Sequence, residues 1–327
     1  MSAPGGATAG RECVLVSGAT GLVGGRLVPA LVRSGYAVRA LSRDAGRIER
    51  RFAALGGGVE GVTWDGVRPP APALAGAAAV VHLAGEPVFG GLPSAQRRAR
   101  IRASRIDSTE HFVQSIAALA AAERPRAFVC ASAVGYYGDR GEERLAEDSA
   151  PGRGFLAEVC IDWERAAEDA AAHGVRVARL RIGVVLAREG GALPLMARPF
   201  RFGAGIRLGD GRQWFPWIHV DDLVGMLVCA VRDPAWSGAI NAVAPSPVRN
   251  AELTAALART LGRSLWLDRL VGARALYGRL MPAAARAALG EMAGELLGSR
   301  RVVPERALAL GYAFSHPGIE DALAAEL

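Results

Sequence analysis

The sequence predicts an α/β fold with a doubly wound, mostly parallel sheet and a smaller helix-rich C-terminal lobe. Two observations predict it. Short apolar segments of strand length alternate with amphipathic segments of helix length between residues 13 and 186, as expected of a parallel sheet whose crossovers are helices. Beyond residue 186 the alternation ends, and residues 250–327 are mostly helical in pattern and rich in arginine.

The first strand and helix meet at a glycine-rich stretch. The apolar segment 14–16 runs into Gly18, Gly21 and Gly24, and an amphipathic helix follows. Glycine is needed where the backbone turns tightly, approaches a phosphate, or lets a helix pack close to a strand. The N-terminus of the helix adds unpaired N–H donors for an anion. The stretch therefore predicts a dinucleotide site, although its spacing is G-x-x-G-x-x-G rather than G-x-G-x-x-G. Its expected contacts are Gly18, Thr20, Gly21, Leu22, Val23 and Gly24.

The second strand, 37–41, is followed by Ser42, Arg43 and Asp44. At this strand end a carboxylate would accept a hydrogen bond from the ribose 2′-hydroxyl of NAD, whereas an arginine would pair with the 2′-phosphate of NADP. Because Ser42 and Arg43 come before Asp44, we expect a preference for NADP(H), with NAD(H) left open.

The rest of the first half continues the alternation. Strands are expected at 59–64, 79–83, 127–132 and 176–186, with helices at 47–55, 94–121 (one helix or two) and 155–173. A short helix at 223–231 and a last strand at 239–243 follow. The strand ends supply the other expected cofactor contacts, which are Asp65, Leu83, Ala84, Gly85 and Ser132.

These elements divide the chain. We expect a disordered tail at residues 1–11 and a dinucleotide-binding domain at 12–185, completed by about 217–245. The substrate lobe is expected from 186–216 and 246–327. A small-molecule substrate should then lie between the lobes at the carboxyl edge of the sheet.

The composition indicates a globular protein of the cytoplasm. Of its 327 residues, 51% are hydrophobic and 22% charged, and no apolar run is long enough for a membrane span. The net charge is +7, but the arginines are spread along the chain, and the densest group, at 97–105, has no interleaved aromatic residues. Solvated helix faces or contacts to an acidic ligand are therefore favoured over nucleic-acid binding.

Metal and lysine chemistry are not expected. The four cysteines form no C-x-x-C pair, and the five histidines show no ligand spacing, so no metal site is predicted. The chain contains no lysine, which excludes any mechanism that requires an ammonium group.

Several longer motifs coincide in one family. The chain resembles the extended or atypical short-chain dehydrogenases/reductases, and within them the NAD(P)-binding "epimerase family" (NAD-dependent epimerase/dehydratase-like) with a C-terminal helical extension. The matching segments are SGATGLVG at 17–24, VVHLAGEP at 80–87, SAVGYYGD at 132–139, FLAEVCIDWE at 155–164, RIGVVL at 181–186, GRQWFPWIHVDDL at 211–223 and NAVAPSPV at 241–248.

The resemblance implies a site from which this chain departs. In the wider superfamily a Ser or Thr at the end of the fifth strand positions the substrate oxygen. A Tyr-x-x-x-Lys on the next helix supplies the general acid/base and lowers its pKa. Ser132 matches the serine, whereas the segment 155–164 contains neither Tyr nor Lys. The usual proton transfer therefore cannot be carried over to this chain.

Two substitutes for the missing tyrosine and lysine are available. Glu158 and Asp162 lie four residues apart and hence on one face of the helix. A carboxyl group desolvated against a nicotinamide could act as general acid/base, and Glu158 is the better placed; solvated charges, with Asp162 paired to Arg165, are the alternative. Tyr136 or Tyr137 could also act as an acid, or could pack against cofactor or substrate.

Substrate contacts are expected from Tyr136, Arg181, Arg212 and Trp217. Either arginine could hold an anionic group bidentately; an ion pair of Arg181 with one of the aspartates 221 and 222 is the alternative. Trp217 could line a substrate pocket or pack between the lobes.

These observations predict an NADP(H)-dependent oxidoreductase or epimerase acting on a small polar, sugar-like substrate. A protein that binds NADP(H) or senses redox state without turnover is the alternative, because the Tyr and Lys are missing. Nucleic-acid binding is least favoured, and a homodimer is left open.

Overall fold

The computed structural model describes residues 10–88, 94–265 and 298–327. A seven-stranded parallel sheet lies at its centre, in the strand order β11-β7-β5-β4-β1-β2-β3. The order reverses between β1 and β4, which makes the carboxyl ends of these strands the topological switch point of a doubly wound sheet. The strands are β1 (Cys13–Ser17), β2 (Ala37–Ser42), β3 (Val59–Thr63), β4 (Ala79–His82), β5 (Ala127–Ala133), β7 (Arg176–Ile182) and β11 (Gly238–Ala242).

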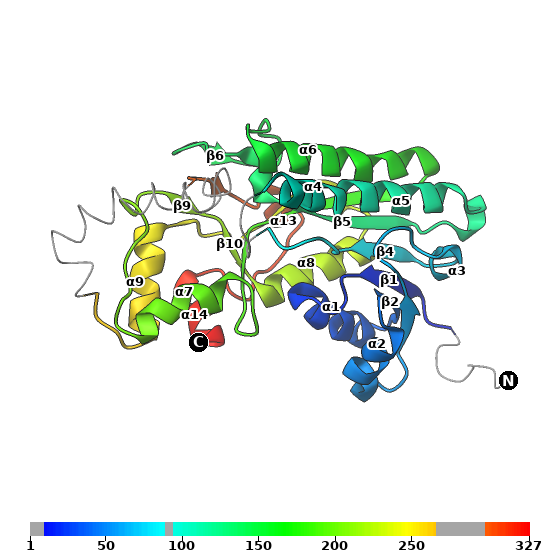
Figure 1. Ribbon diagram of the computed structural model, residues 1–327, viewed down its shortest axis with the longest axis horizontal. Coiled ribbons are helices and arrows are strands. Elements are labelled where there is room, and N and C mark those ends of the chain that lie inside the picture. The colour runs from blue at the N-terminus through cyan, green and yellow to red at the C-terminus, as the bar shows by residue number, and fades with distance from the viewer. Residues whose placement is uncertain (1–9, 89–93, 266–297) are drawn as a thin grey trace.

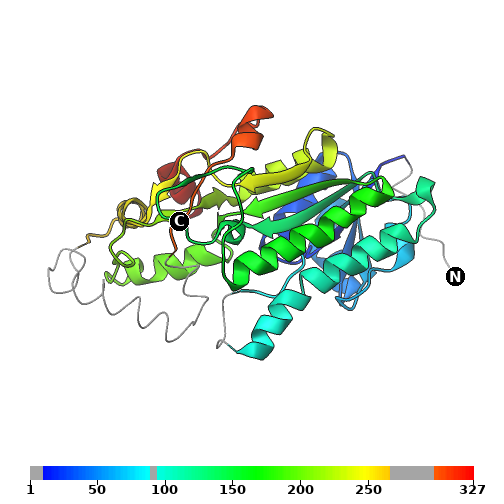
Figure 2. The ribbon, with the colours of Figure 1, turned by 90° about the horizontal axis from the view of Figure 1, so that it is seen from above.

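Helices cover both faces of this sheet (Figure 1). One face carries α1 (Leu22–Arg33), α2 (Ala45–Phe52) and α8 (Val220–Arg232), and the other carries α4 (Ala95–Ala103), α5 (Ile106–Ala117) and α6 (Phe155–Glu168). Seen from above, α6 runs along the strands (Figure 2). The predicted doubly wound fold is thus confirmed.

The two faces of the sheet bury separate apolar clusters. Leu27, Leu31 and Leu227 belong to the cluster between the sheet and the pair α1 and α8. Phe112 and Trp163 belong to the cluster beneath α5 and α6. Full burial of each such side chain stabilises the fold by about 1.5–3 kcal/mol.

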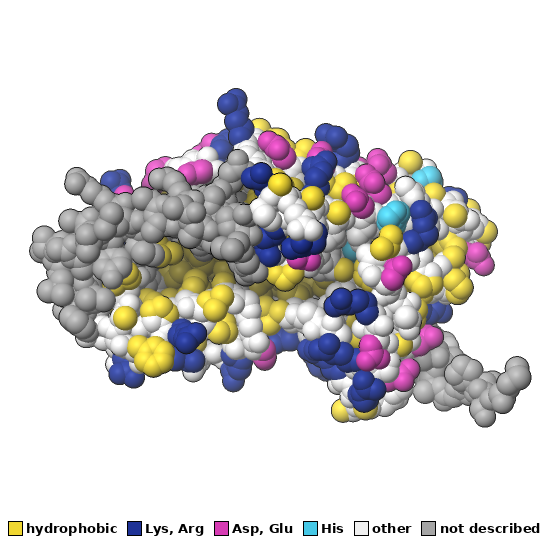
Figure 3. All heavy atoms as spheres, viewed as in Figure 1, with side chains coloured by type: hydrophobic (Ala, Val, Ile, Leu, Met, Phe, Trp, Pro, Cys, Tyr) yellow, Lys and Arg dark blue, Asp and Glu magenta, His cyan; other side chains and the backbone are white. Residues whose placement is uncertain are grey.

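A helix-rich part extends from one end of the sheet (Figure 1). Its helices are α7 (Ala192–Arg201), α9 (Asn250–Thr260) and α14 (Ile319–Glu326), which bury a third apolar cluster. The surface of this part has a hollow in which hydrophobic side chains are exposed (Figure 3). The remaining elements are short: α3 (Ala71–Leu74), α13 (Glu305–Ala309), the 3-10 turns η1 (Ala53–Leu55), η2 (Ala121–Glu123), η3 (Val134–Tyr137) and η4 (Asp169–His173), and the strand pairs β8 (Val184–Leu186) with β10 (Trp217–His219), β9 (Trp214–Phe215) with β12 (Val248–Arg249), and β6 (Arg144–Leu145) with β13 (Arg301–Val302).

The structure corrects several expected elements. The expected strand 176–186 is two strands, because β7 joins the central sheet whereas β8 leaves it to pair with β10. Gly183 marks the break: its N–H donates to Ala242 O, and a Cβ there would lie 2.9 Å from Pro216 O. The segment 94–121 forms two main helices. No helix was predicted where α7 lies.

Part of the expected organisation lies outside the described residues. Residues 1–9 of the expected tail and residues 266–297 of the expected helical remainder fall there. The proposed division into two domains stays a prediction. Among the described helices, none is both long enough and apolar enough to cross a membrane.

Candidate functional site

The glycine loop, residues 18–24, leaves no room for a side chain at Gly18 or Gly24. Gly18 has φ +73°, and a Cβ on it would lie 2.9 Å from the carbonyl carbon of Leu83 on the neighbouring strand end. A Cβ on Gly24 would lie 2.2 Å from Gly18 O, which also accepts the N–H of Gly21 at 3.0 Å. Gly21 is the N-cap residue of α1 and offers no side-chain cap. The N–H groups of the first turn of α1 are therefore available to an anion.

The end of β2 presents a carboxylate and a guanidinium in different surroundings. Asp44 is the N-cap of α2, where its carboxylate accepts the N–H of Arg47 at 3.0 Å and lies 3.4 Å from Arg50. Ser42 Oγ accepts the N–H of Asp44 at 3.2 Å. Arg43 is exposed, and its side chain has no hydrogen bond or ion pair within the described part of the chain. The carboxylate is therefore engaged by α2, whereas the guanidinium is not.

A buried hydroxyl organises the turn that follows β4. Ser17 Oγ accepts the N–H groups of Leu83 and Ala84 at 3.2 and 3.3 Å and lies 2.6 Å from His82 Nδ1. The other ring nitrogen of His82 lies 3.3 Å from Ser108 Oγ. Burial lowers the pKa of His82 to about 3, so the ring is neutral at physiological pH. This contact fixes the strand end beside the glycine loop.

Two other expected cofactor contacts, Asp65 and Gly85, lie close to other residues of the chain. Asp65 is exposed after β3 and accepts the N–H of Val67 at 2.8 Å, which closes a turn. A Cβ on Gly85 would lie 3.4 Å from the guanidinium carbon of Arg105. Their assignment to the cofactor stays a prediction.

Ser132, Arg181 and Asn241 lie side by side on β5, β7 and β11. Glu164, on α6, covers the first two. Ser132 Oγ donates to Glu164 Oε1 at 2.7 Å, and the Arg181 guanidinium donates to the two carboxylate oxygens at 2.8 and 2.9 Å. All four side chains are buried. The carboxyl ends of β5 and β7 are therefore joined by a buried polar network.

The network continues from Arg181 to Tyr137. Arg181 Nη1 donates to the Tyr137 hydroxyl at 2.9 Å and to Glu147 O at 3.0 Å, and the hydroxyl lies 2.7 Å from Asn241 Oδ1. The Tyr136 ring stacks 3.5 Å from the guanidinium carbon. Burial lowers the pKa of Arg181, but its bonds to Glu164 more than offset that effect and raise the pKa overall. Burial raises the pKa of Tyr137 to about 12.

This arrangement changes the expectations for Arg181. Four of its hydrogen bonds run to groups of the fold, and its expected contact with a substrate stays a prediction. The alternative ion pair with Asp221 or Asp222 is wrong, because the partner is Glu164. Ser132 gives its only hydrogen to the same carboxylate.

The carboxylates expected near Ser132 lie elsewhere on α6. Glu158 is exposed in the first turn, and its carboxylate makes no hydrogen bond or ion pair with another described residue. Asp162 pairs with Arg102 at 2.7 Å and with Arg165 at 3.5 Å. The structure therefore does not join either carboxylate to Ser132.

Sequence reasoning missed Glu164, although a signal was present. Ala157, Cys160 and Ala167 are buried on α6, and residue 164 continues their spacing of three and four. A charged residue within an apolar helical stripe requires a buried partner. Arg181 on the facing strand is that partner.

The two remaining substrate candidates behave differently. Trp217 is 1% exposed and belongs to the apolar cluster of the helix-rich part, together with Leu186 and Leu257. Trp217 thus packs within the core of this part, and its expected contact with a substrate stays a prediction. Arg212 is exposed in the loop before β9.

A polar cavity of about 670 Å³ flanks the network. Its lining includes Tyr136, Glu164, Arg179, Arg181 and Arg306. No residue of the glycine loop lines this cavity. Tyr136 thus faces a space apart from the loop.

The fold also brings two histidines together. Donor atoms of His219, Asp221 and His316 lie within 4.8 Å of one another. The two rings stack with centroids 3.7 Å apart, and His219 Nδ1 accepts the N–H of Asp221 at 3.2 Å. Burial lowers the pKa of His219. The expectation that the chain holds no metal stays a prediction.

The strand order and the glycine loop at the switch point define a dinucleotide-binding Rossmann fold. The chain belongs to the NAD-dependent epimerase/dehydratase family, whose pattern matches residues 14–242. The pattern of a domain of unknown function, DUF1731, matches residues 282–326. The expected family and C-terminal extension are thereby confirmed.

Similar proteins span the whole chain. The sequence is 40% identical over 312 residues to the chloroplastic epimerase family protein SDR39U1 homolog of Arabidopsis thaliana, covering 95% of this chain and 86% of that protein. The crystal structure of human epimerase family protein SDR39U1 (isoform 2) with NADPH superposes with a TM-score of 0.79 at 31% identity, covering 96% of this chain and 98% of that one. The nucleoside-diphosphate sugar epimerase of Corynebacterium glutamicum superposes with a TM-score of 0.73 at 35% identity, covering 97% of this chain and 58% of that one.

Proposed function

We propose that this protein binds NADP(H) at the glycine loop and uses it as an oxidoreductase or epimerase on a small polar, sugar-like substrate. The observation that carries the cofactor assignment is the free guanidinium of Arg43 beside the engaged carboxylate of Asp44. A carboxylate held by the N-terminus of α2 is not turned to a ribose 2′-hydroxyl, whereas a free arginine gives a 2′-phosphate charge-assisted hydrogen bonds. The human relative, 31% identical, was crystallised with NADPH.

The glycine loop fits a dinucleotide. A side chain at position 18 or 24 would meet backbone atoms at 2.9 Å or less, so these glycines allow the tight turn and the close packing of helix on strand that a dinucleotide loop requires. The first turn of α1 offers its N–H groups to the phosphates. NADP(H), when bound, supplies or accepts a hydride.

The substrate class rests on chemistry and on similarity. A hydride can be removed from an alcohol carbon of a sugar, with loss of the hydroxyl proton, and returned to the carbonyl carbon that results. The relative from C. glutamicum is described as a nucleoside-diphosphate sugar epimerase. Ser132 Oγ has its hydrogen on Glu164, so its oxygen is left to accept a hydrogen bond from a substrate hydroxyl. Glu158 is the only acidic residue in the first turn of α6, and we assign the proton transfer to it.

Binding without turnover is the second candidate function. It is favoured by α6, which offers neither Tyr nor Lys, and by the engagement of Ser132 within the fold. A catalytic site normally leaves its acid or base within reach of the substrate.

Calorimetry with NADPH and NADH tests the cofactor assignment. Arg43→Ala should weaken NADPH binding about tenfold or more and leave NADH binding unchanged, since charge-assisted hydrogen bonds contribute about 1.5–3 kcal/mol. Arg33→Ala removes an exposed arginine at the far end of α1 and is the matched control. Equal affinity of the wild type for NADPH and NADH would contradict the assignment.

Two assays separate the two functions: oxidation of NADPH in the presence of small carbonyl compounds detects an oxidoreductase, and chromatography of sugar nucleotides incubated with the protein and NADP⁺ detects an epimerase, which consumes no cofactor overall. Turnover that falls more than tenfold in Ser132→Ala and in Glu158→Gln supports catalysis with these roles. Tight NADPH binding with no turnover of any compound in either assay supports the binding protein.

A further inference from the structure

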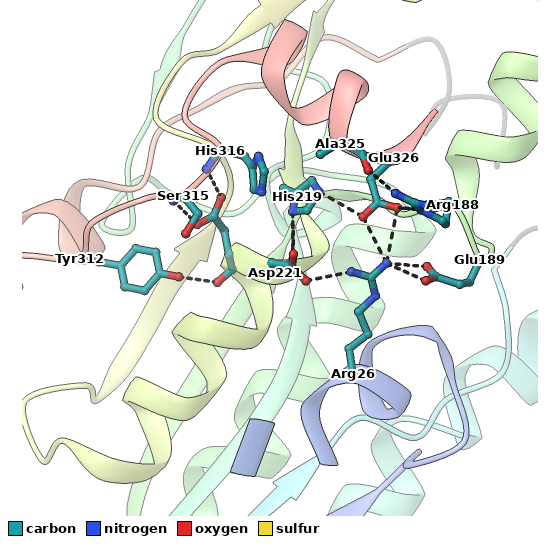
Figure 4. A network of polar contacts seen from close by, with 11 residues as sticks. Arg26, Arg188, Glu189, His219, Asp221, Tyr312, Ser315, His316, Ala325 and Glu326 are labelled. Atoms are coloured by element: carbon teal, nitrogen blue, oxygen red, sulfur yellow. Dashed lines mark hydrogen bonds and ion pairs between the residues drawn. The ribbon is translucent and has the colours of Figure 1, made fainter. Parts of the chain in front are cut away.

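Arg26 gathers three carboxylates from three separate segments (Figure 4). It lies in the second turn of α1, directly after the glycine loop. Its guanidinium lies 2.7 Å from Glu189, 2.9 Å from Asp221 and 3.2 Å from Glu326. These carboxylates come from the loop after β8, the start of α8 and the end of α14. Arg26 therefore connects the cofactor helix to the C-terminal segment, residues 298–327.

Glu326 is the buried member of this group. Its side chain is 3% exposed. It accepts the backbone N–H of Arg188 at 2.6 Å, and it lies 3.4 Å from Arg188 Nε and 3.2 Å from His219 Nε2. A buried carboxylate is retained only where such partners surround it. The end of α14 is therefore bonded to the loop that carries Arg188 and Glu189.

That loop packs directly against the glycine stretch. A Cβ on Gly191, which has φ +71°, would lie 3.0 Å from Leu22 Cδ2, and one on Gly190 would lie 3.8 Å from Leu22 Cδ1. Leu22 is the first residue of α1. The start of the cofactor helix is thus in contact with a loop that the C-terminal segment holds in place.

We infer that Arg26 and Glu326 are positioning residues of the dinucleotide site, through which the C-terminal segment raises cofactor affinity without touching the cofactor. The inference rests on the proposed binding of NADP(H) at the glycine loop. Without Arg26, the three carboxylates would repel one another, and loop 187–191 would lose its bond to α1. Without the Glu326 carboxylate, Arg188 and Arg26 would both lose their buried acceptor.

Linkage makes the effect reciprocal. If a seated C-terminal segment favours the loop geometry that binds NADP(H), then bound NADP(H) must favour the seated segment by the same factor. A merely structural role for the ion pairs would lower stability but would not link the two events.

Calorimetry with NADPH tests the first half of this relation. Arg26→Gln and Glu326→Gln should raise the Kd for NADPH at least about fivefold. Glu320→Gln is the matched control, because Glu320 lies on the same helix but pairs with Arg259 on α9 and should leave the Kd unchanged. Glu189→Gln, at an exposed position, gives a smaller increase in the same direction and serves if Glu326→Gln does not fold.

Hydrogen exchange of the wild-type protein tests the second half. NADPH should slow the exchange of α14 amides, whereas in Glu326→Gln the slowing should shrink or vanish. If the wild type binds NADPH and the Arg26 and Glu326 variants bind it with the same Kd, the inference is overturned while the proposed cofactor stands. Absence of NADPH binding by the wild type would overturn the proposed cofactor and the inference with it.

Discussion

Glu164 on α6 and Arg181 on β7 form a bidentate ion pair in which each side chain is 5% exposed. Removing two charges from water costs several kcal/mol per ion, and mutual attraction offsets this cost only when the remaining donors and acceptors are also satisfied. Ser132 donates a further hydrogen bond to the carboxylate of Glu164, and the hydroxyl of Tyr137 accepts one from the guanidinium of Arg181. The pair is therefore stable only as part of the whole network.

Glu164→Gln should lower the free energy of unfolding by about 3 kcal/mol, because it leaves the buried Arg181 charge without a counter-ion. Denaturant titration of the variant measures the loss. Glu158→Gln, on the same helix but exposed, should change stability by no more than about 0.5 kcal/mol. A comparable loss in both variants would contradict the structural role of the pair.

Combining Glu164→Gln with Arg181→Met should recover part of the lost stability. The double variant removes both charges, so no buried charge is left unpaired. If the two single effects simply add, the pair does not act as a unit.

Tyr137→Phe should lower the free energy of unfolding by about 1–3 kcal/mol. It removes the hydroxyl that accepts from Arg181 and lies 2.7 Å from Asn241 Oδ1, and both of these groups are buried. The neighbouring Tyr136→Phe should cost little, because the ring that stacks on Arg181 is retained. Thermal or denaturant unfolding of the two variants distinguishes them, and a reversed order would refute the assignment.

The central sheet and its phosphate loop could be predicted from the sequence because each depends on local patterns. Strand β1 is an apolar run followed by three glycines, of which Gly21 and Gly24 are required by contacts within the loop and Gly18 by its positive φ and by Leu83 after β4. The sequence also placed Ser132 at a strand end. Such features follow from chain connectivity and from the steric limits of the backbone.

The partners of buried charges could not be predicted in the same way. Glu164 and Arg181 are 17 residues apart and meet only because α6 packs against β7, and Arg26 meets Glu326 across 300 residues. On sequence alone, any of several carboxylates could have formed the ion pair with each arginine. Tertiary packing alone selects between them, and the same packing placed Trp217 in the core.

Gly24→Ala should disrupt the glycine loop, whereas Gly25→Ala should not. A Cβ at position 24 would lie 2.2 Å from Gly18 O, a backbone atom that cannot move away without deforming the loop. At position 25 the close neighbour, at 2.3 Å, is the end of the Arg51 side chain, which can swing aside. We expect Gly24→Ala to cost about 1–3 kcal/mol of stability and to abolish NADPH binding. Gly25→Ala should keep both, and equal behaviour of the two variants by calorimetry would contradict the loop geometry.

His82 should make the protein less stable in mild acid. Its pKa is lowered to about 3 in the fold from an ordinary value of 6.5. Below about pH 6.5 the ring therefore becomes protonated in the unfolded chain but stays neutral in the folded protein. The stability that the neutral ring contributes is complete above that pH and falls by about 1.4 kcal/mol per pH unit, which is about 2 kcal/mol by pH 5. Denaturant unfolding at pH 7 and pH 5 should show a smaller loss in His82→Gln than in the wild type. His173→Gln, at the end of η4, should retain the wild-type loss, because the effect arises only where the ring is closed off from water and engaged at both nitrogens by Ser17 and Ser108.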